Sequence, residues 1–230
     1  MFGLKSKVST SQHFVLGTPL VTAVQAGEAE ALFGCGCFWG AEKGFWRLPG
    51  VVTTAVGYAG GQAADPSYEQ VCSGRTGHAE VVRVVWDTDR IGFADLLKLF
   101  WECHDPTQGD RQGNDRGSQY RSAIYVNDQT LLVEAEASRT SYQQRLSAAG
   151  FGAITTEIRL DVPFHPAEAY HQQYLARPGS RPYCSAQPTR VALEGYEGAD
   201  FLLDPAIWSF YDWSESHCVL RGDNAPIQMD

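Results

Sequence analysis

Cys37 has the surroundings of a reactive thiol in this sequence. An apolar run at 31–33 predicts a buried strand, glycines at 34 and 36 predict a tight turn, and aromatic residues at helical spacing predict a helix from about residue 38. Free backbone N–H groups and the helix dipole favour negative charge at a helix N-terminus, so this position lowers the pKa of a thiol and produces the nucleophilic thiolate. The alternative is a buried structural cysteine, the usual environment of a free cysteine.

Glu80 is the second candidate, because it begins a valine-rich strand directly after a glycine-containing loop. If its side chain faces inward, desolvation raises the pKa of the carboxyl and keeps it protonated near neutral pH, as a general acid requires. The alternative is a solvated carboxylate at a strand end.

Tyr68 and Tyr120 could each offer a phenol O–H to a polar substrate atom, and Asp115 lies in a polar, glycine-rich loop. An aspartate in a glycine-rich loop can instead close a turn through its own backbone, and most tyrosines are half-buried with a satisfied hydroxyl. The same choice between a catalytic or ligand role and a hydrogen-bonded structural role applies to three histidines, His78, His104 and His171.

The remaining cysteines suggest a recycling thiol. Cys184 lies in a stretch without regular structure, where a mobile cysteine could reach a second one, and Cys218 in the tail is similar. No Cys-x-x-Cys pair occurs among the 6 cysteines, so a zinc ribbon or a thioredoxin-type motif is not expected. A zinc site built from distant Cys and His residues stays open.

The pattern of elements predicts an α+β fold. Its order fits a two-layer sandwich on a ferredoxin-like split βαβ plan, with a mixed sheet and a long irregular C-terminal segment. Val82, Val84 and Trp86 should share one face of their strand. The expected strands are 31–35, 51–58, 80–86, 120–126 and 154–160, and the expected helices are 38–48, 67–72, 93–100, 129–149 and 166–175.

The charge and the hydrophobic pattern of the sequence limit the kinds of partner that we expect the protein to bind. The net charge of −9 argues against nucleic acid or an anionic membrane. No run of about 18 apolar residues occurs, and the first residues lack the apolar segment of a secretory signal, so we expect a cytoplasmic protein. We also expect an N-terminal arm at 1–29, one main domain at 30–187 and a tail at 188–230.

Seven short motifs occur in an order that is specific in combination, although each is weak alone. Together they resemble the peptide-methionine (S)-S-oxide reductases, the A-type methionine sulfoxide reductases, over roughly residues 33–184. The motifs are GCFWG (36–40), GYAGG (57–61), TGHAE (76–80), HDPT (104–107), QGNDRG (112–117), QYRS (119–122) and AEAYHQ (167–172).

The resemblance implies that the domain at 30–187 reduces methionine S-sulfoxide, free and in proteins. Cys37 matches the nucleophile, and Glu80 matches the acid that protonates the sulfoxide oxygen. Cys184 matches the thiol that resolves a Cys37 sulfenic acid to a disulfide, which thioredoxin or dithiothreitol then reduces. The residues that match the substrate pocket are Phe38 and Trp39, around the methyl group, and Tyr68, Asp115 and Tyr120, around the oxygen. Neither a metal nor an organic cofactor is implied, and we expect a monomer.

Three features depart from the family pattern. Cys35 stands where a small non-thiol residue is expected; in an extended chain its Cα lies about 6–7 Å from that of Cys37, at the limit of a disulfide. Pro182 replaces a frequent glycine, and 187–230 matches nothing familiar, although Cys218 could pass a disulfide outward as a third cysteine does in some members.

Two other functions compete with reduction. One is a silent domain that binds oxidised methionine on partner proteins, against which the intact Cys37 and Glu80 argue. The other is a general thiol-disulfide oxidoreductase, which the missing Cys-x-x-Cys makes less attractive.

Overall fold

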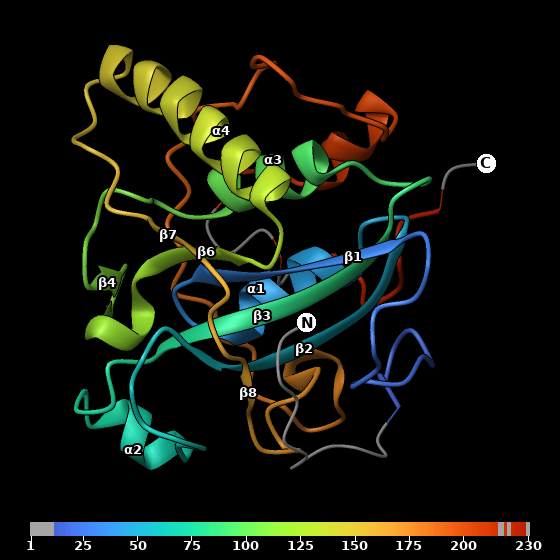
Figure 1. Cartoon of the computed structure of the whole chain (residues 1–230), viewed down its shortest axis with the longest axis vertical. Coiled ribbons are helices and arrows are strands. Elements are labelled where there is room, and N and C mark those ends of the chain that lie inside the picture. Colours follow the sequence, from blue (N-terminus) through green and yellow to red (C-terminus); the bar gives the residue numbers. More distant parts are fainter. Residues whose placement is uncertain (1–11, 216–218, 220–221, 229–230) are drawn as a thin grey trace.

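A six-stranded mixed sheet organises the chain (Figure 1). The structure is a computed structural model that describes residues 12–215, 219 and 222–228. Its strands are β1 (Glu28–Cys35), β2 (Val51–Ala59), β3 (Ala79–Asp87), β4 (Arg111–Gln112), β5 (Asp115–Arg116), β6 (Ser122–Val126), β7 (Glu157–Leu160) and β8 (His165–Pro166). Its helices are α1 (Phe38–Trp46), α2 (Tyr68–Cys72), α3 (Phe93–Cys103), α4 (Gln129–Ala148) and the 3-10 helices η1 (Ser118–Tyr120), η2 (Tyr174–Ala176) and η3 (Pro205–Phe210).

The strand order β7-β6-β1-β3-β2-β8 contains the predicted plan. β1 and β2 each pair antiparallel with β3, so they run in the same direction with β3 between them and α1 as the crossover, which is a split βαβ unit. β3, α3 and β6 form the second such unit around β1. The predicted α+β class is therefore confirmed, with β7 and β8 added at the two edges.

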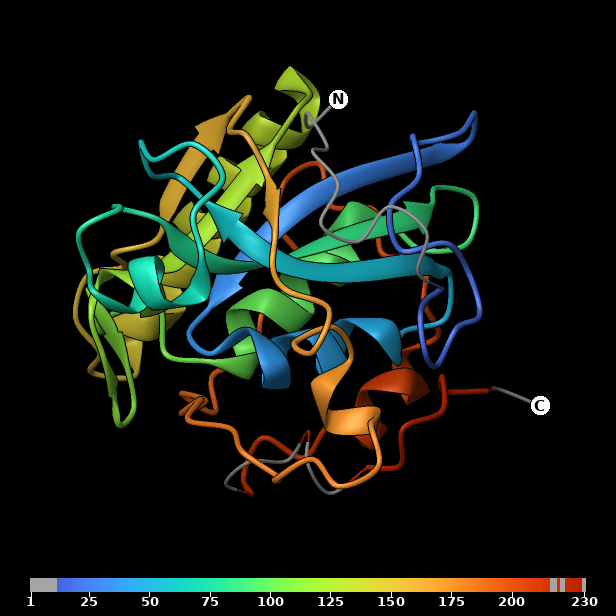
Figure 2. The same ribbon diagram turned by 90° about the horizontal axis from the view of Figure 1, so that it is seen from below.

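The two faces of the sheet carry different cores. Val82, Val84 and Trp86 of β3 lie in the larger apolar cluster, which also contains residues of α1, α3 and α4, as the alternation predicts. Figure 2 shows α1 and α3 together on this side of the sheet. The opposite face is covered by a smaller cluster that includes Leu20 and Phe164. Glu80 has the same parity as Val82, so its side chain points toward the helical layer.

The predicted helix at 166–175 is wrong. β8 occupies its start, and turns and η2 follow. The amide side chain of Gln172 takes the place of a further strand, because its Oε1 accepts from the Val56 N–H and its Nε2 donates to the Val56 carbonyl, both at 2.9 Å. Gly57 permits this close edge, since a Cβ there would lie 2.4 Å from the His165 carbonyl oxygen. Smaller differences are that β6 begins at Ser122, after η1, and that β7 begins at Glu157.

The C-terminal segment is irregular, as predicted, yet it is part of the core. Between 177 and 215 its regular element is η3, and Leu193, Leu203, Ile207 and Tyr211 all lie in the larger cluster. The Tyr211 hydroxyl donates to the Gly44 carbonyl of α1 at 2.8 Å. None of the described helices is long and apolar enough to cross a membrane.

We predict that Ile207→Ala lowers the free energy of unfolding by about 2–5 kcal/mol, because Ile207 is 1% exposed and its truncation leaves a cavity against the helical layer. The matched control is Leu202→Ala on the same segment, where the side chain is 43% exposed and the loss should stay below about 1 kcal/mol. Urea unfolding followed by tryptophan fluorescence measures both. Equal losses would contradict a packed role for this segment.

Candidate active site

Cys37 is the N-cap of α1 and lies two residues after the end of β1. Gly36 makes the turn between them, with a φ of +87°, and a Cβ there would lie 2.6 Å from the Gln112 side chain. The predicted strand, glycine turn and helix are thus confirmed, and Cys37 lies at the helix N-terminus as a residue of intermediate exposure.

The carboxyl of Glu80 meets this helix N-terminus. Its Oε2 accepts a hydrogen bond of 3.1 Å from the backbone N–H of Phe38, the residue directly after Cys37. Glu80 is 2% exposed, and burial raises the pKa of its carboxyl to about 8, with a further rise from the charge of Asp115 and a partial offset from the Phe38 N–H. The carboxyl is therefore predominantly protonated at neutral pH, which corresponds to the inward-facing alternative and not to the solvated one.

The thiol of Cys37 does not have the predicted low pKa. Desolvation raises the pKa of Cys37 well above its usual range, and the negative charge of Glu80 raises it further, while the backbone N–H of Trp39 lowers it. In the resting site, therefore, the helix N-terminus is outweighed by burial. A second buried acid beside the thiol makes two simultaneous negative charges unfavourable.

Three predicted polar groups surround this pair. The Tyr68 and Tyr120 hydroxyls both have a raised pKa, caused first by burial and then by neighbours that include Glu80, so both remain hydrogen-bond donors at neutral pH. Asp115 interacts electrostatically with both Cys37 and Glu80. The structure thus brings Cys37, Glu80, Tyr68, Asp115 and Tyr120 into one site.

The two predicted aromatic residues differ in exposure. Phe38 is 1% exposed and packs against His171, with ring centroids 5.2 Å apart. Trp39 is partly exposed, stacks on Tyr174 at 4.0 Å and donates its indole N–H to His171 Nδ1 at 3.2 Å. Trp39 and Tyr174, with Arg181 and Tyr183, line an open and largely apolar recess of about 300 Å³.

Cys184 is buried against α1, and Gly40 makes room for it. A Cβ at Gly40 would lie 2.8 Å from the Cys184 sulfur, and Gly40 is one helical turn after Cys37. Burial raises the pKa of Cys184 to about 11. The structure therefore places the Cys184 thiol one helical turn along α1 from Cys37, with which it interacts electrostatically, whereas Cys218 lies outside the described residues.

Tyr183 and Ser185, which flank Cys184, were missed by the sequence analysis. The Tyr183 hydroxyl donates to Asp115 at 2.5 Å, and the Ser185 hydroxyl donates to the other oxygen of the same carboxylate. Asp115 thus links the pair of Cys37 and Glu80 to the segment that carries Cys184. The sequence signal available for Tyr183 and Ser185 is their adjacency to Cys184.

Glu168 is a further residue that the sequence left without a role. Its carboxylate accepts from the Tyr58 hydroxyl at 2.9 Å and from the Tyr68 backbone N–H at 3.0 Å, which fixes the start of α2 beside the site. The ring of His171 packs between Phe38 and Tyr68, and burial lowers the pKa of its imidazole to about 4. His171 is therefore neutral and has a structural role, in which its ring packs at the side of the site and its Nδ1 accepts a hydrogen bond from Trp39. This hydrogen-bonded structural role is one of the two that we considered for it.

Comparison with known proteins gives one consistent result. A family model described as peptide methionine sulfoxide reductase matches residues 29–196. A protein of Azotobacter vinelandii named peptide methionine sulfoxide reductase MsrA is 58% identical over 182 residues, 79% of this chain and 83% of the relative, and one of Methylococcus capsulatus with the same name is 52% identical over 196 residues, 85% and 88%.

Solved structures agree in fold. The methionine sulfoxide reductase A of Corynebacterium diphtheriae superposes with a TM-score of 0.73 at 43% identity, covering 84% of this chain and 93% of that one. Mxr1 of Saccharomyces cerevisiae in reduced form superposes with a TM-score of 0.64 at 31% identity, covering 72% and 96%.

We predict that Glu80→Gln moves the alkylation midpoint of Cys37 to lower pH, because the substitution removes a negative charge that raises the pKa of the thiol and retains an acceptor for the Phe38 N–H. Peptide mass spectrometry of the iodoacetamide-labelled protein measures the rate at Cys37 as a function of pH. Asp89→Asn, which neutralises an exposed carboxylate at the opposite end of β3, is the control and should leave the midpoint in place. A midpoint that is equal in wild type and Glu80→Gln would show that the two side chains do not interact.

Proposed function

The chain belongs to the peptide methionine sulfoxide reductase family, and from this premise we propose that it reduces methionine S-sulfoxide to methionine with Cys37 as nucleophile and Glu80 as acid. One observation carries the assignment: the bond from the Phe38 N–H to the Glu80 carboxyl holds an uncharged carboxylic acid beside the reactive thiol. The family supports the product class, and this geometry supports the proposed roles of Cys37 and Glu80.

The protons balance within the pair. A sulfoxide oxygen is a poor leaving group until it is protonated, and Glu80 supplies that proton while Cys37 attacks the sulfur. The proton lost by the thiol restores Glu80, so oxygen ends on Cys37 as a sulfenic acid and methionine departs. At every stage Cys37 and Glu80 therefore carry at most one negative charge between them. The N-terminus of α1 stabilises the charge that develops on the Cys37 sulfur.

The surroundings supply binding and orientation. The neutral hydroxyls of Tyr68 and Tyr120 can donate to the sulfoxide oxygen, since neither is ionised at neutral pH. Trp39, which is partly exposed, can present apolar surface to the methyl group, and the buried ring of Phe38 lies beside it with ring centroids 6.5 Å apart. Asp115 holds the segment that carries Cys184 through its two hydroxyl contacts, in addition to the role around the oxygen that the family resemblance implies.

Cys184 is the proposed resolving thiol. Its sulfur lies against Gly40, one turn from Cys37, so a small displacement delivers it to the sulfenic acid. Condensation of the Cys184 thiol with the Cys37 sulfenic acid gives a disulfide and water.

An external dithiol must then reduce this disulfide by exchange. We propose thioredoxin as that dithiol, and methionine S-sulfoxide, both protein-bound and free, as the substrate. The proposal also includes a monomeric protein in the cytoplasm that needs no resident cofactor. The net charge of −9 supports the exclusion of nucleic acid as a partner. Cys218 remains a candidate for passing the disulfide outward.

We predict that the purified protein with dithiothreitol consumes the S epimer of methionine sulfoxide and leaves the R epimer. The sulfoxide sulfur is stereogenic, and its oxygen and methyl group must face Glu80 and the aromatic side chains at the same time. Chromatography of both epimers measures the reaction, and Cys37→Ser is the control that should abolish it. Equal turnover of the epimers, or none, would overturn the proposed function.

We also predict that Cys184→Ser produces one methionine per chain and then stalls when thioredoxin is the reductant, because the Cys37 sulfenic acid has lost its partner. Cys72→Ser is the matched control: Cys72 is exposed, and its variant should sustain turnover. A burst assay that counts methionine per chain distinguishes the two. Sustained turnover of Cys184→Ser at the wild-type rate would move the resolving role to another cysteine.

A further inference from the structure

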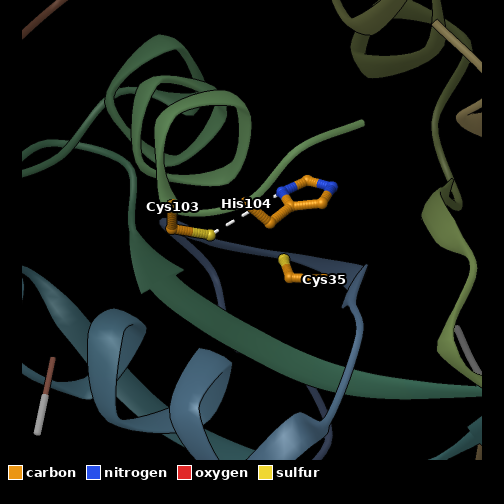
Figure 3. A group of neighbouring side chains, drawn as sticks. All are labelled: Cys35, Cys103 and His104. Atoms are coloured by element: carbon orange, nitrogen blue, oxygen red, sulfur yellow. Dashed lines mark hydrogen bonds between the residues drawn. The ribbon is translucent and has the colours of Figure 1, made fainter. Parts of the chain in front are cut away.

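A second pair of thiols lies buried behind the active site. Cys35 is the last residue of β1 and Cys103 is the last residue of α3, and they are 3% and 7% exposed. Their sulfurs and a ring nitrogen of the adjacent His104 all lie within 4.8 Å of one another. Figure 3 shows the three side chains together. The nearby Cys35 thiol and burial both raise the pKa of the Cys103 thiol well above its usual range.

The hydrogen bonds of His104 argue against a metal at this cluster. Its Nδ1 lies 2.7 Å from the Phe100 carbonyl oxygen, which can only accept, so Nδ1 carries the proton. Its Nε2 is engaged by the Ser122 hydroxyl at 2.8 Å. Both ring nitrogens are thus committed, and the two thiols that remain fall short of the ligand set of a structural zinc site.

The buried pair is connected to the active site through Cys184. Cys35, Cys103 and Cys184 line the same cavity of about 10 Å³, whose other walls include Gly40 and Leu99. Cys184 and Cys103 also interact electrostatically. A disulfide between Cys37 and Cys184 would therefore present its Cys184 sulfur to the buried pair.

We propose that Cys35 and Cys103 form a second redox-active dithiol, which reduces the disulfide between Cys37 and Cys184 from inside the protein. The inference rests on the proposed function, because methionine sulfoxide is the oxidant. In the first exchange the Cys103 sulfur attacks Cys184, the bond between Cys37 and Cys184 breaks, and Cys37 leaves with the proton that Cys103 gave up. In the second exchange Cys35 attacks Cys103, a disulfide between Cys35 and Cys103 forms, and Cys184 is released as a thiol. Two electrons move from the buried pair, and the active site is ready for another sulfoxide.

The positions of the pair suit this exchange. Cys35 and Cys103 each end a regular element, where the backbone can adjust to bring their sulfurs to the bond length of a disulfide. His104 Nδ1 lies 3.8 Å from the Cys103 sulfur, and its interaction lowers the pKa of Cys103 against the larger effects of Cys35 and burial, which hold that pKa well above its usual range. Because little thiolate is present at neutral pH, the exchange is slow, and the buried pair acts as a reserve rather than as the main reductant.

Counting methionine without a reductant tests the proposal. The protein used carries Cys72→Ser and Cys218→Ser, so that four cysteines remain. It is reduced, desalted under nitrogen and mixed with excess methionine S-sulfoxide. We expect about two methionines per chain, a fast first and a slower second, because each of the two dithiols supplies two electrons when it is oxidised to a disulfide. Adding Cys35→Ala and Cys103→Ala should reduce the yield to about one, and that first equivalent reports that the Cys37 site is intact.

Disulfide mapping of the wild-type protein after the same treatment provides a readout that does not depend on how the variants fold. We expect a peptide pair linked through Cys35 and Cys103, and a linked pair of Cys103 and Cys184 in the Cys35→Ala variant. One methionine per chain with Cys35 and Cys103 still alkylable would overturn the inference, and so would stoichiometric zinc in the purified protein. If no first methionine forms even with dithiothreitol, the proposed function itself fails.

Discussion

The hydrogen bond between the Glu80 carboxyl and the Phe38 backbone N–H is the interaction on which the site depends. It brings two acids to one buried helix N-terminus, and the low polarity of the site prevents both from being charged together. At neutral pH the carboxyl, whose pKa is raised to about 8, is predominantly protonated, and the thiol, whose pKa is raised well above its usual range, is protonated as well. The burial that raises both pKa values thus leaves on Glu80 the proton that the proposed sulfoxide reduction uses.

The register of the sheet makes this contact. Phe33 of β1 lies opposite Val82 of β3, so continuing the antiparallel pairing by two residues places Cys35 opposite Glu80. The turn at Gly36 then carries Cys37 over the end of β3, on the helical face to which Glu80 points. Strand alternation and strand order therefore bring the carboxyl of Glu80 to the same end of the sheet as the thiol of Cys37, 43 positions earlier in the chain.

The dependence of the site on strand register and alternation explains which parts of the fold and of the site could be predicted from the sequence. The helix N-terminus at Cys37 and the inward face of Glu80 depend on local period and glycine placement, which the sequence displays directly. The raised pKa of Cys37 depends on how much protein surrounds the thiol, which no local pattern reports. The helix expected at 166–175 fails for a similar reason, because the Gln172 amide pairs with the distant edge of β2 instead of supporting helical structure. Cys35 and Cys103 are 68 positions apart in the chain, so no local sequence pattern predicts that they lie close together either.

The segment around Cys184 shows how a buried thiol can still be delivered to a reaction. Tyr183 and Ser185 hold it through Asp115, a single carboxylate, rather than through a strand ladder. Such side-chain contacts can be exchanged without unfolding the sheet, and Gly40 leaves space for the sulfur beside α1. Because the next apolar residues of the chain, such as Leu193, are anchored in the core, the displacement stays local. The short segment between α1 and the packed residues would thus let Cys184 react with Cys37 on one side and, in the proposed exchange, with the buried thiols on the other.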